Sequence, residues 1–320
     1  MHFFIRTPLF AGPLLALLWL LCGGCKQRGD ESPSAHTEVA PDGGLNSPAT
    51  DKAEPLGLPD SKWPLAGEID TGNRFLPIVD ILTRIPRGRR KGSHCSGVLL
   101  TPRLVLTAGH CVCQQQERQG PGSESRLVID ASACVTRASV STAIYKPPPP
   151  GMYSLVIERY AGQVRIHPEL KVVLDSSGRV LSSKADLAFI VLDTPVSMAF
   201  APLSLAETGL EVHESIVMVS FGFDEDLGSL GDDRRINRYK VVRLEEPGDE
   251  RILLLQSQRH EYKGDSGGAC LRQGRDGFSL VGISSRGLGQ EPAFTGVLPY
   301  RTWIINEVHR VSQMDPASAQ

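Results

Sequence analysis

The sequence predicts an all-β domain closed by a single C-terminal helix. From Phe75 onward, short apolar runs rich in Val, Ile and Leu are separated by turn signals, and these runs are too short for helices. The 32 glycines and 23 prolines also favour strands and turns over long helices. The exception is Arg301–Ser312, where Ile304, Val308 and Val311 form one apolar stripe that can dock a helix on the domain.

The apolar runs give the expected strands. They are Leu76–Leu82, Gly97–Leu100, Leu104–Thr107, Leu155–Ile157, Leu187–Leu192, Ser215–Val219, Val241–Leu244, Ile252–Leu255 and Leu280–Ile283. No repeat of 33–45 residues is visible, which argues against a solenoid or a propeller.

Composition excludes several classes of protein. With 41% hydrophobic and 22% charged residues, the chain is an ordinary globular protein, neither fibrous nor wholly disordered. The formal net charge of −2 gives no basic excess for binding nucleic acid. We expect a monomer with no cofactor and no metal.

The first 25 residues read as a signal peptide. Arg6 precedes an uncharged stretch from Thr7 to Gly24, whose apolar part, Leu9–Leu21, is too short to span a bilayer comfortably. The alternative is a membrane anchor that remains uncleaved.

The end of this segment, Leu20–Cys25, resembles a bacterial lipoprotein signal. Gly23 and Gly24 precede Cys25, which would carry the lipid, whereas Cys22 departs from the branched aliphatic residue preferred there. The resemblance implies a secreted or cell-envelope protein that touches the membrane only through this anchor. Simple secretion is the alternative.

Residues 26–65 are expected to form a disordered acidic linker. The segment holds six prolines, seven acidic and four basic residues, and Trp63 is its one aromatic residue. Such a stretch cannot bury enough apolar surface to fold. A propeptide removed on maturation is the alternative. The folded domain is then expected at 66–315, with a tail at 316–320.

Three motifs in the predicted domain carry the chemistry. They are Thr107-Ala108-Gly109-His110-Cys111, Ala185-Asp186-Leu187-Ala188 and Gly264-Asp265-Ser266-Gly267-Gly268. In residues, order and context they resemble the trypsin-like (chymotrypsin-fold) serine proteases, over roughly 70–312. The resemblance implies two six-stranded antiparallel β-barrels with a C-terminal helix, and an oxyanion hole formed by the backbone N–H groups of Gly264 and Ser266.

The physical reading of the motifs agrees with the resemblance. A serine hydroxyl is a poor nucleophile at neutral pH and needs an adjacent base. His110 can supply the base, since the pKa of histidine lies near neutrality, and Asp186 can fix its tautomer. Ser266 is then the nucleophile. Glycines on both sides of it allow a tight turn.

The cysteines are read as two disulfides and a free thiol. The resemblance implies a Cys95–Cys111 bond beside the histidine. Cys113 and Cys134 flank an insertion and have no other obvious partners, so we expect them to pair. A zinc site formed by residues of this region remains an alternative; its ligands would come from His94, Cys95, His110, Cys111 and Cys113. Cys270 is expected to be a buried free thiol.

The residues of the expected specificity pocket depart from the trypsin pattern. His260 stands where trypsin-type members place an aspartate, and Glu261 follows it. The resemblance places Ser285 and Gly287 beside the substrate. With His260 and Glu261 they form the expected specificity pocket.

Activation also departs from the family pattern. In the family, Asp265 receives a new amino terminus released by cleavage, but no Ile-Val-Gly-Gly precedes Cys95. Either the chain is cut before Ile69, where the match is poor, or Asp265 is satisfied by another donor.

These observations predict a serine endopeptidase acting on proteins or peptides through an acyl-enzyme intermediate. The missing activation terminus and the altered pocket leave a catalytically silent binding protein of the same fold as the rival. An esterase using the same nucleophile is a weaker one.

Overall fold

A computed structural model of the chain describes most of the expected domain. The described residues are 67–87, 90–119, 125–146, 154–224, 229–230, 233–244, 250–255, 264–288 and 291–314. The predicted signal, linker and tail at 1–25, 26–65 and 316–320 lie outside them, and so do the outermost residues of the expected domain, 66 and 315.

The first barrel is closed by six antiparallel strands in the order β11-β4-β3-β2-β7-β8. It closes because β11 pairs with both β4 and β8. Its strands are β2 (Ile78–Arg87), β3 (Arg90–Thr101), β4 (Leu104–Thr107), β7 (Arg137–Lys146), β8 (Ser154–Ile166) and β11 (Ala188–Leu192). All residues of β4 and β11 are buried, which is why these strands appear in the sequence as unbroken apolar runs.

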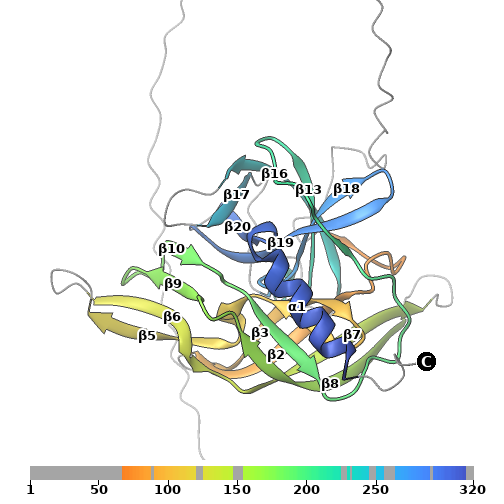
Figure 1. Ribbon diagram of the computed structural model, residues 1–320, viewed down its shortest axis with the longest axis horizontal. Helices are drawn as coiled ribbons and strands as arrows, with labels where there is room; N and C mark the ends of the chain where they lie inside the picture. Colours follow the sequence, from red (N-terminus) through yellow and green to blue (C-terminus); the bar gives the residue numbers. More distant parts are fainter. Residues whose placement is uncertain are drawn as a thin grey trace, which may run out of the picture. The chain divides into compact units, whose positions relative to one another are not determined.

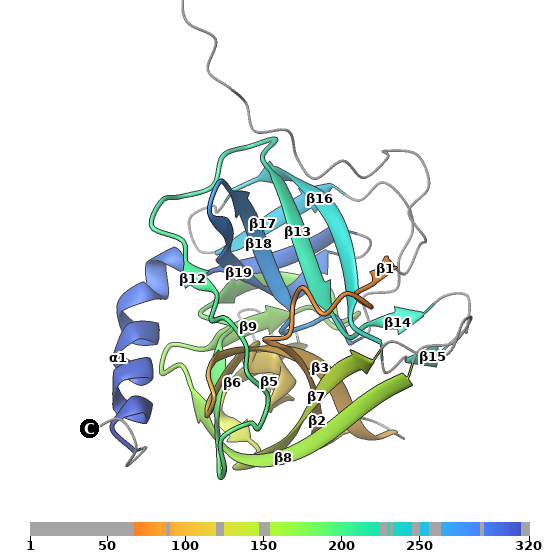
Figure 2. The same ribbon diagram turned by 90° about the vertical axis from the view of Figure 1, so that its right-hand side faces the viewer.

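The second barrel lies above the first in the views of Figures 1 and 2. Its order is β16-β13-β18-β19-β20-β17, closed by the pairing of β16 with β17. Its strands are β13 (Ser215–Ser220), β16 (Arg235–Arg243), β17 (Arg251–Leu255), β18 (Ala269–Gly274), β19 (Gly277–Leu288) and β20 (Glu291–Gly296). The prediction of two six-stranded barrels is therefore confirmed.

Smaller elements surround the barrels. The two-residue strands β1 (Glu68–Ile69) and β12 (Ser204–Leu205) add to β16 and β19 of the second barrel. A four-stranded sheet in the order β10-β9-β6-β5 projects to one side (Figure 1). It consists of β5 (Cys113–Gln119), β6 (Ser125–Cys134), β9 (Lys171–Leu174) and β10 (Val180–Lys184), and β14 (Phe223–Asp224) and β15 (Ser229–Leu230) form a short hairpin.

The C-terminal helix α1 (Arg301–Ser312) has the predicted bounds, and the 3-10 turns η1 (Gly109–Cys111) and η3 (Leu298–Tyr300) are the other helical pieces described. Ile304 and Val311 of α1 are fully buried. The helix follows the second barrel in sequence but packs on the first, where Trp303 stacks on Phe189 of β11 with ring centroids 4.2 Å apart. The helix therefore links the end of the second barrel to the surface of the first, partly through Trp303, which lies outside the predicted stripe.

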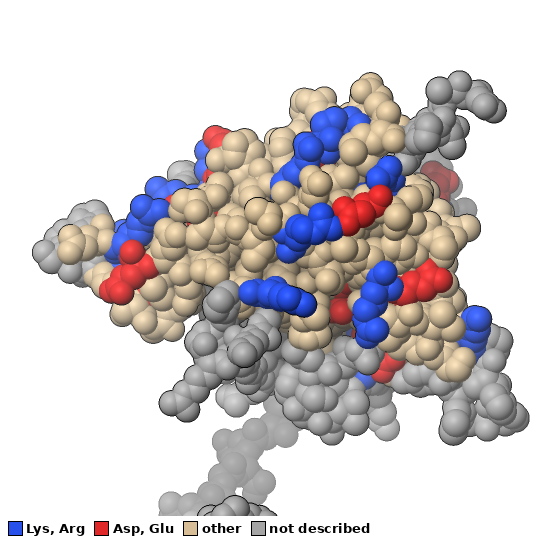
Figure 3. All heavy atoms as spheres, turned by 90° about the horizontal axis from the view of Figure 1, so that it is seen from below, with Lys and Arg blue, Asp and Glu red and all other residues tan. Residues whose placement is uncertain are grey.

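The surface carries charges of both signs. On the face shown in Figure 3, basic and acidic side chains are interspersed among uncharged residues. Among the described residues, no helix is long and apolar enough to cross a membrane.

Candidate active site

His110 lies in η1, directly after strand β4 of the first barrel, and its side chain is buried. Its Nδ1 is 2.6 Å from Oδ2 of Asp186, and its Nε2 is 2.8 Å from Oγ of Ser266. If Nδ1 donates to the carboxylate, Nε2 is left as an acceptor for the serine hydroxyl. Three residues distant in sequence thus form one chain of hydrogen bonds.

Asp186 lies between β10 and β11 and is completely buried. Besides Nδ1 of His110, its carboxylate accepts the backbone N–H of His110 at 2.8 Å and the hydroxyl of Ser285 at 2.6 Å. Burial alone would raise the pKa of this carboxyl, but the charge and hydrogen bonds of His110 and the hydroxyl of Ser285 outweigh it and lower the pKa to about 2. The carboxylate is therefore ionised at neutral pH and holds the imidazole in place.

Ser266 precedes β18 of the second barrel in a turn that requires glycine. Gly267 has φ +86°, and a Cβ at this position would lie 2.0 Å from the carbonyl oxygen of Ser96. The Gly267 N–H donates to the carbonyl of Ser284 at 2.7 Å. Glycine after the nucleophile thus lets the loop approach strand β3 closely.

The residue before Asp186 is held in an unusual conformation. Ala185 has φ +48°, which is uncommon for a residue with a side chain. Its N–H donates to the hydroxyl of Tyr300 at 2.9 Å and to a carboxylate oxygen of Glu250 at 3.0 Å. The Tyr300 hydroxyl also donates to Glu250. Glu250 and Tyr300 thus hold the backbone of Ala185, the residue directly before Asp186.

The family model of the trypsin-like peptidase domain matches residues 95–283, more than half of the 320-residue chain. The chain belongs to the trypsin-like peptidase family. Membership supports a function of the serine-protease type on protein or peptide substrates. The matched range includes His110, Asp186 and Ser266.

This member of the trypsin-like peptidase family contains both expected disulfides. Cys95–Cys111 joins β3 to the turn that carries His110, and Cys113–Cys134 joins the start of β5 to the end of β6. These bonds remove three thiolates from the alternative zinc set, so the structure does not contain that site. Nδ1 of His94 instead lies 3.5 Å from Oδ1 of Asp80. Cys270 is buried and is the free cysteine of the described residues, as predicted.

The residues expected in the specificity pocket of the peptidase fall into two groups. His260 and Glu261 lie outside the described residues. Ser285 and Gly287 both belong to β19, but the Ser285 hydroxyl is bound to Asp186. The side chain of Ser285 therefore contacts Asp186, a contact that the sequence analysis did not predict.

Sequence reasoning also missed residues that hold the site from outside the motifs. Ser96 and Ser220 contact the loop around Ser266, and Glu250 and Tyr300 hold Ala185. Ser96 offered a weak signal, since it is a polar residue beside Cys95 in an otherwise largely apolar segment. Glu250 offered none, because it belongs to no motif recognised in the sequence.

Proposed function

We propose that the protein is a serine endopeptidase that uses Ser266, His110 and Asp186 as a catalytic triad. The observation that supports this most directly is the continuous hydrogen-bond chain from the Asp186 carboxylate through both ring nitrogens of His110 to the Ser266 hydroxyl. Family membership supplies the substrate class.

In the first half of the proposed reaction, Nε2 of His110 takes the Ser266 proton while Oγ attacks the carbonyl carbon of the scissile peptide bond. The resulting oxyanion is bound by the backbone N–H groups of Gly264 and Ser266, the proposed oxyanion hole. His110 then gives the proton to the leaving amine, the C–N bond breaks, and an acyl ester remains on Ser266.

In the second half, water enters in place of the amine. His110 removes a proton from this water, hydroxide adds to the ester carbonyl, and the acid product leaves as Oγ regains its proton. Asp186 stays ionised throughout because its pKa of about 2 lies far below neutral pH. Its role is to orient the ring and to stabilise the imidazolium that forms twice in each cycle.

The proposed substrate path runs along β19. An extended peptide would pair with its backbone near Ser285 and Gly287, as a strand added to the sheet. The side chain before the scissile bond would meet His260 and Glu261, the two pocket residues proposed from the sequence. A peptide-library cleavage assay on the wild type and on Glu261→Gln tests that part of the proposal.

Active-site labelling tests the proposed function. A fluorophosphonate should modify Ser266 in the wild type, with loss of hydrolysis, whereas Ser266→Ala should take up no label and hydrolyse no peptide. A matched control is Ser279→Ala, a serine in β19 outside the motifs, which should label like the wild type. Absence of label from folded wild-type protein would contradict the proposal and favour the silent binding protein.

We also propose the organisation inferred from the sequence: a signal at 1–25 with lipid on Cys25, a linker at 26–65, and a monomeric domain at 66–315 in the cell envelope or secreted. The disulfides support this, because such bonds form in oxidising compartments. Intact mass and N-terminal sequencing of the native protein test it. A lipid-modified Cys25 is expected at the mature terminus, and retention of residues 1–24 would contradict the proposal.

A further inference from the structure

The loop that carries Ser266 is contacted by two serines from other parts of the fold, Ser96 and Ser220. Ser96 lies in β3 of the first barrel and Ser220 at the end of β13 of the second. Both side chains are completely buried. Between them they bind three consecutive residues, Gly264, Asp265 and Ser266.

Ser96 fixes the two ends of this segment. Its N–H donates to the carbonyl of Ser266 at 2.7 Å, and its hydroxyl donates to the carbonyl of Gly264 at 2.9 Å. The same hydroxyl oxygen accepts the N–H of Phe221 at 2.8 Å, and its carbonyl accepts the hydroxyl of Thr107 at 2.7 Å. With every polar group of Ser96 engaged, the carbonyls on both sides of Asp265 are held in place.

Ser220 fixes the middle of the segment. Its hydroxyl donates to Oδ1 of Asp265, whose side chain is almost completely buried. The carboxylate packs against the backbone of Gly222, where a Cβ would lie 2.1 Å from Oδ1. A buried carboxylate needs hydrogen-bond donors, and Ser220 supplies one from inside the barrel.

The segment that contains Ile69, strand β1, is paired with strand β16 and not with the loop of Ser266. Ile69 pairs with Arg235 of β16, and Arg235 pairs in turn with Ser220 of β13. Strand β16 therefore lies between Ile69 and Ser220, which are separated by two strand spacings, about 10 Å. An amino group at Ile69 reaches Asp265 only if β1 leaves the sheet.

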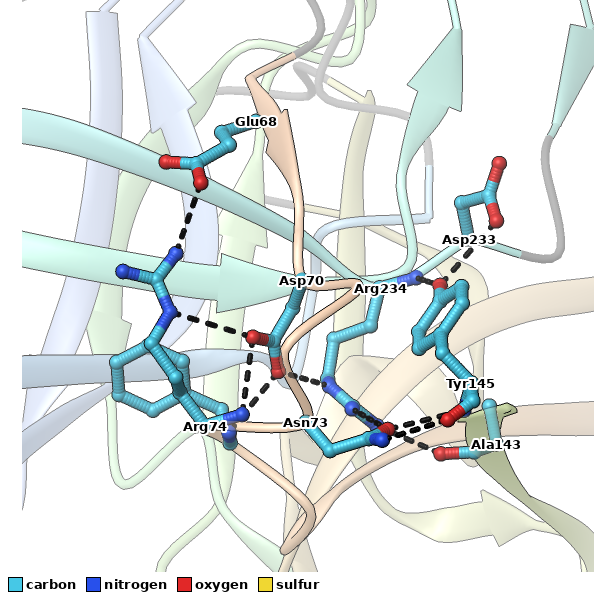
Figure 4. Close-up of polar contacts among 9 residues, drawn as sticks. Glu68, Asp70, Asn73, Arg74, Ala143, Tyr145, Asp233 and Arg234 are labelled. Carbon is cyan, nitrogen blue, oxygen red and sulfur yellow. Dashed lines mark hydrogen bonds and ion pairs between the residues drawn. The ribbon is translucent and has the colours of Figure 1, made fainter. Parts of the chain in front are cut away.

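Leaving the sheet would break a buried ion pair at the next residue (Figure 4). Oδ2 of Asp70 lies 2.9 Å from Nε of Arg234, and both side chains are fully buried. The Asp70 carboxylate also accepts the N–H groups of Arg74 and Phe75, and its own N–H donates to the carbonyl of Arg234 at 2.8 Å. Separating such a pair leaves uncompensated charge in the interior.

We infer that Ser96 and Ser220 are positioning residues that set the loop of Gly264–Ser266 for catalysis, so that the site is competent without a new amino terminus at Ile69. This inference rests on the proposed function, because it concerns the regulation of the same site. It selects the second alternative of the sequence reading, in which Asp265 is satisfied by another donor. Cleavage before Ile69 is then not required for the site to become active.

The first test asks whether the uncut chain is active. The full chain, with its mass verified, is titrated with a fluorophosphonate, and the labelled molecules are sequenced from the amino terminus. Label is expected on molecules that are uncut between residues 26 and 70. Label confined to molecules that begin at Ile69 would overturn the inference but leave the proposed function intact, and absence of label from all folded molecules would overturn both.

The second test uses Ser220→Ala and Ser96→Ala, with Ser93→Ala as control. Ser93 is a buried serine of the same strand as Ser96 and lies three residues before it. Each test variant should lower kcat about 10- to 100-fold, because the oxyanion donors move from their positions, while KM changes less than about threefold. The control should retain wild-type kcat. Unchanged kcat in folded Ser220→Ala and Ser96→Ala would overturn the inference, and the uncut-chain test decides it if either variant fails to fold.

Discussion

The two barrels hold their parts of the proposed triad by different means. On the first-barrel side, a disulfide joins the turn of His110 to β3, and Asp186 binds His110 of that turn through two hydrogen bonds. On the second-barrel side, the loop of Ser266 is held by hydrogen bonds from the hydroxyl groups of Ser96 and Ser220, and Cys270, four residues after Ser266, is not in a disulfide. The base is thus fixed by a covalent bond and by charge, and the nucleophile by hydroxyl groups.

This difference indicates which part of the site is more easily displaced by substitutions. A hydrogen bond contributes about 1 kcal/mol between neutral groups and about 2 kcal/mol when a carboxylate accepts it, whereas a disulfide contributes about 3 kcal/mol. The position of the nucleophile therefore responds to smaller changes than the position of the base. We expect substitutions around Ser96 and Ser220 to alter turnover without unfolding the domain, and substitutions around His110 to cost stability as well.

The largest effect is expected from the ion pair that fastens β1 to the second barrel. Asp70→Asn leaves the buried Arg234 without a countercharge and should lower the free energy of unfolding by about 3–5 kcal/mol. Urea denaturation measures this change. Glu68→Gln is the matched control, since Glu68 forms an exposed pair with Arg74, and its effect should stay below about 1 kcal/mol. Equal effects of the two variants would contradict the prediction.

The next effect separates stability from activity on the first-barrel side. The double variants Cys95→Ser/Cys111→Ser and Cys113→Ser/Cys134→Ser each open a loop of similar length, 16 and 21 residues in sequence separation. Both should lower the free energy of unfolding by about 3 kcal/mol. Only the first should also lower kcat/KM, because it releases the turn of His110. A loss of kcat/KM in both, measured well below the melting transition, would show that the Cys113–Cys134 sheet also shapes the site.

The smallest effect concerns the link between the barrels at Asp186. Ser285→Ala removes a hydrogen bond that lowers the pKa of Asp186, so that pKa should rise above its value of about 2. A depressed carboxyl pKa contributes stability above the unfolded value of 3.8, and this contribution is lost as the pH falls toward 2. In the variant, the stability at neutral pH should fall by about 2 kcal/mol. The acid loss should still begin near the unfolded value of 3.8, but it should end at a higher pH and be smaller, because the folded-state pKa lies closer to 3.8. Chemical denaturation between pH 2 and 7 measures both, and superimposable profiles would contradict the prediction.

Several elements were accessible from the sequence because burial leaves a pattern there. The helix Arg301–Ser312 was predicted with its observed bounds, since Ile304, Val308 and Val311 mark its buried face. Strand β4 was predicted for the same reason, as all of its residues are buried. The sequence motifs also singled out His110, Asp186 and Ser266, and His110 lies within hydrogen-bond distance of the other two in the structure.

Other elements escaped because their sequences carry no apolar period. Strand β5 reads Cys-Gln-Gln-Gln-Glu-Arg-Gln and is largely exposed, so nothing in it indicates a strand. Much of β16 was missed as well, because Arg235 and Asn237 are buried polar residues on a barrel strand. The contacts of Ser96 and Ser220 were not predictable, since they join residues 168 and 45 positions apart through single hydroxyl groups.

The packing of α1 on the first barrel has a consequence for synthesis of the chain. A chain emerging from the ribosome completes the strands of the first barrel at β11, yet Phe189 of that strand lacks its cover until Trp303 has emerged near the C-terminus. Tyr300, which holds the residue before Asp186, arrives at the same late point. The first barrel and the residue before Asp186 therefore acquire their final contacts only after residues 300–303 have been synthesised.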